Sequence, residues 1–150
     1  MTWSVLTLFL LMIIGCGGTS LAPSPTPAQT LDLDPETAEL WTGWAADAGQ
    51  IAGLTAQMYN SGVMLPSQAA QQQERAKTLA EEIRGGESSN ELVLRLADDL
   101  DEVVGALEFG LQYAENSGLS VINIVLPNLP DALTQLAEDA TALSEMLEAG

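Results

Sequence analysis

Four segments of the chain after residue 34 carry apolar residues at alternating steps of three and four. This spacing constrains the fold most, because it places the apolar side chains of each segment along one face of an α-helix. Breaks rich in proline, glycine, serine or asparagine separate the segments, and such breaks end helices. The sequence therefore predicts an all-α fold, an antiparallel helical bundle of about four helices over residues 35–150.

The first predicted helix begins at Asp34-Pro35-Glu36, where Asp34 can cap the helix and Pro35 fits its first turn. It ends at Asn60-Ser61-Gly62. The two tryptophans of this helix admit two interpretations, a flat ligand shelf or core residues, and their helical spacing favours the core. The predicted core face consists of Trp41, Trp44, Ala48, Ile51, Thr55 and Met58.

The second predicted helix starts at Pro66-Ser67, with Ser67 as a cap, and stops at Gly85-Gly86. Its apolar face is weak. Three glutamines, Gln71-Gln72-Gln73, lie within this helix and are predicted to form solvated surface. The residues expected in the core are Ala69, Ala76, Leu79 and Ile83.

The third predicted helix is capped by Ser88-Ser89-Asn90-Glu91 and closed by Asn116-Ser117-Gly118. Residues 119–126 are rich in β-branched side chains but have no partner strand, so we expect a short buried helix or a tucked connector there. The last helix starts near Asp131. The core faces are Leu92, Leu96, Leu100, Val103, Leu107, Leu111 and Ala114 in the third helix, and Leu133, Leu136, Ala140, Leu143 and Leu147 in the last.

Ala45, Gly49 and Gly53 recur every four residues on the first predicted helix. A glycine inside a helix costs about 0.5–1 kcal/mol relative to alanine, and close packing against another helix would offset that cost. Asp47 and Gln50 make the segment too polar to cross a bilayer. We therefore predict that the three small residues line a close helix–helix contact. The partner is either another helix of the bundle or the same helix of a second copy, which would make a homodimer.

The chain is strongly acidic, with 21 Asp and Glu against 4 Lys and Arg and a net charge of −17. All of the acids lie at or after Asp32. Such a surface repels nucleic acid, because phosphate binding requires a basic surface. It attracts cations or a basic protein partner, but the favoured interpretation is a solvated acidic surface, and the sequence identifies no partner. The chain has no histidine, which excludes imidazole general bases and histidine-ligated zinc or haem. No cofactor is expected.

Asp98, Asp101 and Glu102 share one face of the third predicted helix, because they lie three and four residues apart. Carboxylates in this pattern are either a cation-binding or acid–base site or a solvated surface. Residues 32–36 begin like a calcium-binding loop, but the loop's turn-forming glycine is missing. The solvated surface is the favoured interpretation, so neither a metal nor a catalytic residue is predicted.

An apolar run from Val5 to Ile14, interrupted only by Thr7, precedes the only cysteine of the chain, Cys16. At about 10 residues the run is shorter than the roughly 20 that a helix needs to cross a bilayer. Its length matches the apolar core of a secretory signal, and small residues follow it at once. The alternatives are plain secretion, an uncleaved membrane helix from Thr2 to about Gly18, and a buried core helix.

The segment Ile13-Ile14-Gly15-Cys16 resembles the lipobox of bacterial lipoproteins, in which an aliphatic residue and two small or tolerated residues precede a cysteine. The resemblance implies that residues 1–15 are a signal peptide, cut before Cys16, and that lipid on the Cys16 thiol ties the chain to a membrane. It also implies an outer-membrane destination in a cell that has one, because Gly17 is not the aspartate associated with inner-membrane retention.

Residues 16–34 would then form the lipidated cysteine and a linker rich in proline, serine and threonine, a composition that favours extended chain. The sequence thus predicts a lipid-anchored protein of the cell envelope, at the periplasmic side of the outer membrane or at the cell surface. We expect this protein not to be an enzyme. Its expected role is that of a non-catalytic binding, scaffolding or spacing module. The alternative is a cation-binding or carboxylate-dependent hydrolytic domain anchored at the membrane.

Overall fold

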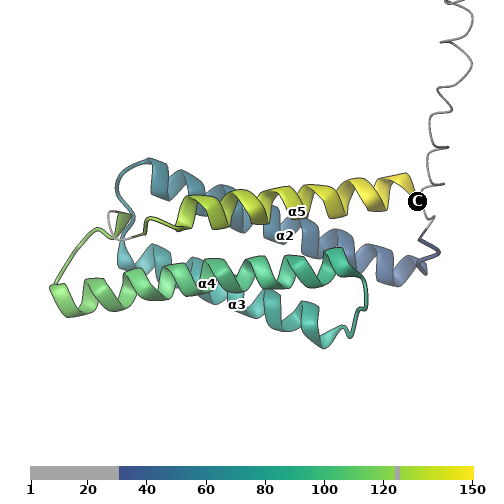
Figure 1. Ribbon diagram of the computed structural model, residues 1–150, viewed down its shortest axis with the longest axis horizontal. Helices are drawn as coiled ribbons and strands as arrows, with labels where there is room; N and C mark the ends of the chain where they lie inside the picture. Colours follow the sequence, from purple (N-terminus) through teal and green to yellow (C-terminus); the bar gives the residue numbers. More distant parts are fainter. Residues whose placement is uncertain (1–30, 124–125) are drawn as a thin grey trace, which may run out of the picture. The chain divides into compact units, whose positions relative to one another are not determined.

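The computed structural model describes residues 31–123 and 126–150. A compact unit runs from Asp32 to Gly150 and contains no strand among these described residues. Its helices connect in an antiparallel order, so the predicted all-α bundle of about four helices is confirmed (Figure 1). They are α2 (Pro35–Asn60), α3 (Pro66–Gly85), α4 (Glu91–Ser117) and α5 (Leu129–Ala149).

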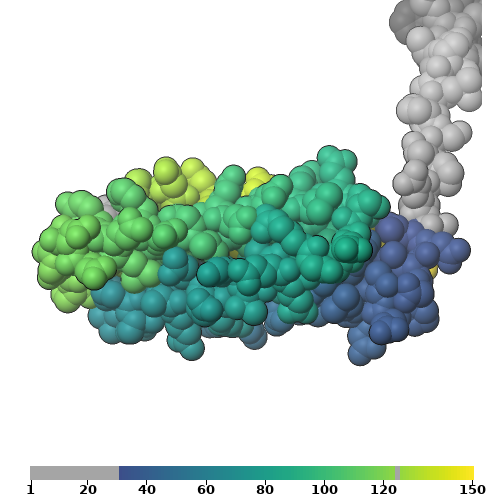
Figure 2. Space-filling model, turned by 90° about the horizontal axis from the view of Figure 1, so that it is seen from below, coloured from purple at the N-terminus to yellow at the C-terminus, as the bar shows by residue number. Residues whose placement is uncertain are grey.

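The helices of the bundle pack in a ring. The most extensive contacts join α3 to α4 and α2 to α5, and further contacts between α4 and α5 and between α2 and α3 close the ring. In Figure 1 the pair α2 and α5 lies above the pair α3 and α4. Figure 2 shows a face of the bundle that α3 and α4 largely cover. The pairing gives α2 and α5 a shared outer surface of their own.

Two helices begin at the predicted caps. At the start of α2, Asp34 Oδ1 accepts the N–H of Thr37 at 3.0 Å, and hydrogen bonds with Thr37 lower the pKa of Asp34. At the start of α4, Asn90 Oδ1 accepts the N–H of Leu92 at 3.0 Å. Gly118 follows the end of α4 in the left-handed conformation, with φ of 64°, which glycine adopts without strain.

The predicted cap of α3, Ser67, is wrong. The N-cap position belongs to Leu65, which is extended as expected for a residue before proline. Pro66 is therefore already the first helical residue and Ser67 lies inside the helix. The N–H of Leu65 donates instead to Gln68 Oε1 at 3.0 Å, so a glutamine in the first turn satisfies the helix end.

Trp41 and Trp44 are only 5% and 3% exposed, which confirms that both are core residues. The indole N–H of Trp44 donates to Glu82 Oε1 at 3.1 Å, so this polar group has a partner. Most of the apolar residues predicted for the core are buried. Those that are only half-buried are Met58, Leu92, Leu111 and Leu147.

Gln72 is 5% exposed, so the prediction that all three glutamines lie on the surface is wrong for this residue. It turns inward because it lies three residues after Ala69 and four before Ala76, on the core face of α3. Its Oε1 is buried without a hydrogen-bond partner. A polar run on a helix therefore still sends one residue to the core when the run crosses the apolar face.

For the segment predicted as a short buried helix or a tucked connector, residues 119–122 and 126 form a connector between α4 and α5, and Asn123 lies in a 3₁₀ turn. Ile122 is fully buried, and its N–H donates to the carbonyl of Met64 at 3.1 Å. Asn123 accepts the N–H of Met64 and donates to the carbonyl of Tyr59. The connector thus closes one end of the bundle by bonding to the turn between α2 and α3.

No helix among the described residues is long and apolar enough to cross a membrane. The predicted signal peptide (residues 1–15), Cys16 and most of the predicted linker lie outside the described part of the chain.

Candidate functional site

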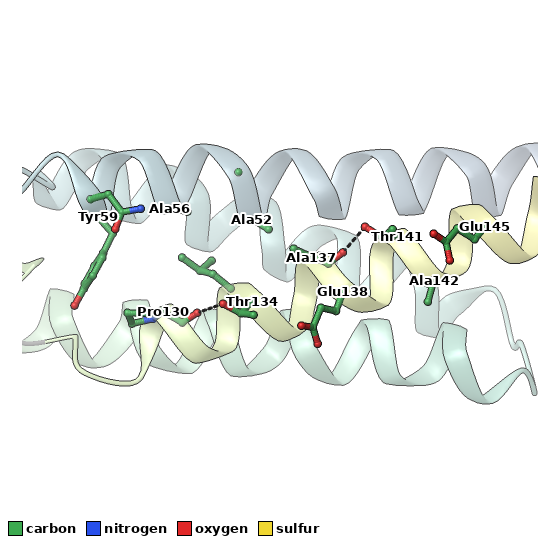
Figure 3. A pocket seen from close by; sticks show the side chains of 13 residues that line it. Ala52, Ala56, Tyr59, Pro130, Thr134, Ala137, Glu138, Thr141, Ala142 and Glu145 are labelled. Atoms are coloured by element: carbon green, nitrogen blue, oxygen red, sulfur yellow. Dashed lines mark hydrogen bonds between the residues drawn. The ribbon is translucent and has the colours of Figure 1, made fainter.

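An open groove of about 560 Å³ follows the junction of α2 and α5 (Figure 3). Residues with small side chains line much of its two walls, which is why two packed helices leave a hollow between them. Ala52, Gly53 and Ala56 belong to the α2 wall, and Thr134, Ala137 and Thr141 belong to the α5 wall.

The lining of the groove is more apolar than its threonines suggest. Thr134 Oγ1 donates to the carbonyl of Pro130 at 2.9 Å, and Thr141 Oγ1 donates to the carbonyl of Ala137 at 2.8 Å. Both hydroxyls are therefore satisfied within α5, and a ligand need not supply a partner for them. On the opposite wall, a Cβ added at Gly53 would meet nothing within 4 Å. The groove thus has free space at this position.

The charge around the groove has one sign. Glu138 and Glu145 are part of its lining, and no Lys or Arg is. Neither α2 nor α5 contains a basic residue anywhere along its length. The acids of the groove lining therefore have no basic residue on either of the helices that form its walls.

The three small residues predicted to line a helix contact, Ala45, Gly49 and Gly53, lie in two different environments. Ala45 is buried in the bundle, at 3% exposure. Gly49 and Gly53 have nothing within 4 Å of an added Cβ, so no helix of the described bundle approaches them closely. Contact of these two glycines with a second copy stays a prediction. Close approaches occur instead at two other glycines, where an added Cβ would meet the ring of Trp44 at Gly86 and the side chain of Leu126 at Gly110.

The structure brings together two of the three predicted carboxylates on α4 and separates the third. Asp98 and Asp101 both pair with Arg84 of α3, at 3.1 and 2.6 Å, and all three side chains are largely exposed. Glu102 instead lines a second groove of about 530 Å³ between α4 and the start of α5, beside Phe109, which is 58% exposed. Among the described residues, no group of three or more acids or other ligating residues could hold a metal ion.

Asp99 and Asp139 are the buried acids that sequence reasoning missed. They are 8% and 5% exposed and lie at the contact of α4 with α5. Arg95 Nη2 donates to Asp139 Oδ1 at 3.2 Å. Burial and then the neighbouring Asp139 carboxyl raise the pKa of Asp99 from 3.8 to about 7. A signal was present, because Asp99 lies three residues after Leu96 and four before Val103, on the predicted core face.

The chain matches no protein-family model, and comparisons with curated proteins and with solved structures found no significant match.

Proposed function

We propose that the protein is a lipid-anchored protein of the cell envelope whose helical bundle is a non-catalytic binding module. Lipid on Cys16 would hold the chain at the periplasmic side of the outer membrane or at the cell surface, and the linker would space the bundle from the membrane. The groove between α2 and α5 would bind a basic amphipathic segment of a partner protein. The observation that carries this proposal is an apolar groove with acids, and no base, in its lining.

The chemistry of the groove favours a helical occupant. Alanine, glycine and threonine allow the backbone of an incoming helix to approach closely, and the helix would lay its apolar face into the groove. Glu138 and Glu145 would lie beside Lys or Arg on the flanks of that helix. Exposed charges at the edge of an interface act mainly on the association rate, so binding should weaken as salt rises.

A second copy of the chain is the competing occupant. Each copy carries a net charge of −17, and α2 and α5 offer no base to pair with the acids of another copy. Two such surfaces repel each other. Nucleic acid is disfavoured for the same reason. The charge therefore supports a basic protein partner over a homodimer.

The alternative function, a cation-binding or hydrolytic domain, would depend on the exposed carboxylates of α4. Asp98 and Asp101 already hold the guanidinium of Arg84, which supports a structural role for them. We therefore propose that the bundle acts without catalytic residues.

The groove is tested with a synthetic helical peptide of about five turns, with an alanine–leucine face flanked by lysines, titrated against the full chain in non-ionic detergent. Gly53→Leu fills the groove and should weaken binding at least about tenfold, or 1.4 kcal/mol. Gly49→Leu is the matched control, because Gly49 lies one turn away on α2, also has free space, and is outside the groove lining. It should bind as the wild type does.

Equal affinity of both variants for the peptide would show that net charge alone attracts it, and would contradict the groove. A peptide with glutamates in place of the lysines should not bind. Sedimentation at two protein concentrations decides the competing occupant, since a dimer lost only in Gly53→Leu would assign the groove to a second copy.

The anchor is tested separately by growing cells with radiolabelled palmitate. The wild type should be labelled and Cys16→Ala should not. Equal labelling of the two chains, or labelling of neither, would refute lipid attachment at Cys16 while leaving the groove result untouched.

A further inference from the structure

The buried acids Asp99 and Asp139 join α4 to α5 and have no part in the proposed groove. Arg95 Nη2 is 3.2 Å from Asp139 Oδ1, and the Arg95 side chain is itself half exposed. The second oxygen of each carboxyl, Oδ2 of Asp99 and Oδ2 of Asp139, is buried without a hydrogen-bond partner. Two carboxyl groups in the contact between helices therefore have one cation between them.

We propose that this acid pair is a proton-binding site that makes the packing of α4 against α5 depend on pH near neutrality. One guanidinium compensates one carboxylate, and a second buried negative charge without a partner is costly. A proton on Asp99 removes that charge. It also supplies an O–H donor, which two ionised carboxylates lack, for an acceptor oxygen of Asp139.

The charged groups near Asp99 act in the same direction, with one exception. Asp139 on α5 and Glu102 on α4 both disfavour its ionised form, and Arg95 alone opposes them. Burial is the largest cause of the raised pKa, which reaches about 7. Asp99 thus keeps its proton over a range where an exposed aspartate has lost it.

The other two helices supply no further cation to the pair. Arg84 of α3 is held by Asp98 and Asp101 at the exposed junction of α3 with α4. Arg75 of α3 donates to Gln50 of α2 at 2.8 Å. The acid of α2 nearest mid-helix, Asp47, lines a groove with residues of α3. Arg95 is therefore the cation paired with the buried acids in the described bundle.

A divalent cation is the competing ligand, because Ca²⁺ and Mg²⁺ also bind carboxylates. Ca²⁺ takes six to eight oxygen ligands, and a metal would stand beside the positive charge of Arg95. The described residues contain no third acid or other ligand arranged with the pair for a metal. A proton requires only the two carboxyl groups.

Linkage fixes the sign of the pH effect. The folded chain holds the Asp99 proton up to about pH 7, whereas an unfolded aspartate releases it near 3.8. Between these values the folded state binds one proton more than the unfolded state. At this site the unfolding constant therefore increases by up to about tenfold for each unit by which the pH rises. The proton's stabilising effect is complete below 3.8 and is lost as the pH rises through 7.

The test uses the full chain in non-ionic detergent, with ¹³C-labelled aspartate carboxyls assigned by through-bond correlation. One carboxyl resonance, that of Asp99, should titrate near pH 7. Urea unfolding followed by circular dichroism between pH 5 and 8 then compares the wild type with Asp99→Asn. The unfolding constant of the wild type should rise more steeply with pH than that of Asp99→Asn. Asp98→Asn, the same substitution at an exposed neighbour, should follow the wild type.

Titration of Asp99 near pH 4 would overturn the proposal, as would an Asp99→Asn variant with the same pH dependence as the wild type. If Asp99→Asn does not fold, the carboxyl titration of the wild-type chain decides alone. Titration with CaCl₂ and MgCl₂ separates the two ligands. A saturable metal site that displaces the Asp99 proton would replace the proton site with a metal site.

Discussion

The two helix pairs of the bundle differ in their basic residues. All four basic residues lie on α3 and α4, where two arginines pair with carboxylates at 2.6 to 3.2 Å. The helices α2 and α5 contain acids and no base. The four bases are Arg75, Lys77, Arg84 and Arg95.

This difference separates charges that hold the bundle together from charges that are free for a ligand. On α3 and α4 the arginines bridge neighbouring helices, so each helps to fix one helix against the next. Along the α2–α5 groove the acids have no intramolecular cation in the lining. Structural and binding charges are thus carried by different residues, even on α5, where Asp139 pairs with Arg95 and Glu138 and Glu145 line the groove.

The largest effect on the charges that hold the bundle together is expected from a substitution of Arg95, because its removal leaves two buried acids without a cation. Arg95→Met should destabilise the bundle by about 2–3 kcal/mol at pH 8, below the usual cost for a fully buried pair because the arginine is half exposed. The loss should shrink at pH 5, where the proton on Asp99 leaves only one buried carboxylate without the guanidinium. Urea unfolding at the two pH values measures both effects.

Arg84→Met is the matched control for Arg95→Met, because Arg84 contacts two acids whose side chains are 76% and 52% exposed. Exposed ion pairs contribute about 0–1 kcal/mol, and salt screens them. A cost for Arg84→Met equal to that for Arg95→Met would show that both arginines sit in similar environments, and the distinction between buried and exposed pairs would fail.

The fold was largely predictable, because it depends on patterns that the sequence repeats. The step of three and four recurs in every helix, and residues such as Asp34, Asn90 and Gly118 mark helix ends by their own side chains or backbone freedom. The prediction of Ser67 as the cap was wrong because the proline fixes the helix start two residues earlier than a Ser67 cap would.

The candidate sites were much less predictable, because they depend on which helices become neighbours. Gly53 repeats with Ala45 and so resembles a packing position, but the helix beside it leaves a groove at that level. Asp99 lies in a run of acids that reads as surface, although its own register is that of the core. Its partner Asp139 lies 40 residues further along the chain, and no local pattern connects the two.

A smaller difference between the two helix pairs is expected at Gly110 of α4 and Gly53 of α2. A Cβ at Gly110 of α4 would clash with Leu126 and lie 3.5 Å from Ile122 Cδ1, whereas a Cβ at Gly53 of α2 meets free space. Gly110→Leu should destabilise by about 1–3 kcal/mol through overpacking. Gly53→Leu should be neutral or stabilise by up to about 1 kcal/mol, because leucine favours helix over glycine. Urea unfolding of the two variants in the full chain measures the difference.

Gly110→Ala adds a graded control, since its smaller clash competes with the gain in helix propensity and should leave a cost below that of leucine. A Gly53→Leu chain as unstable as Gly110→Leu would mean that another surface covers Gly53, and the groove would not be free to bind a ligand.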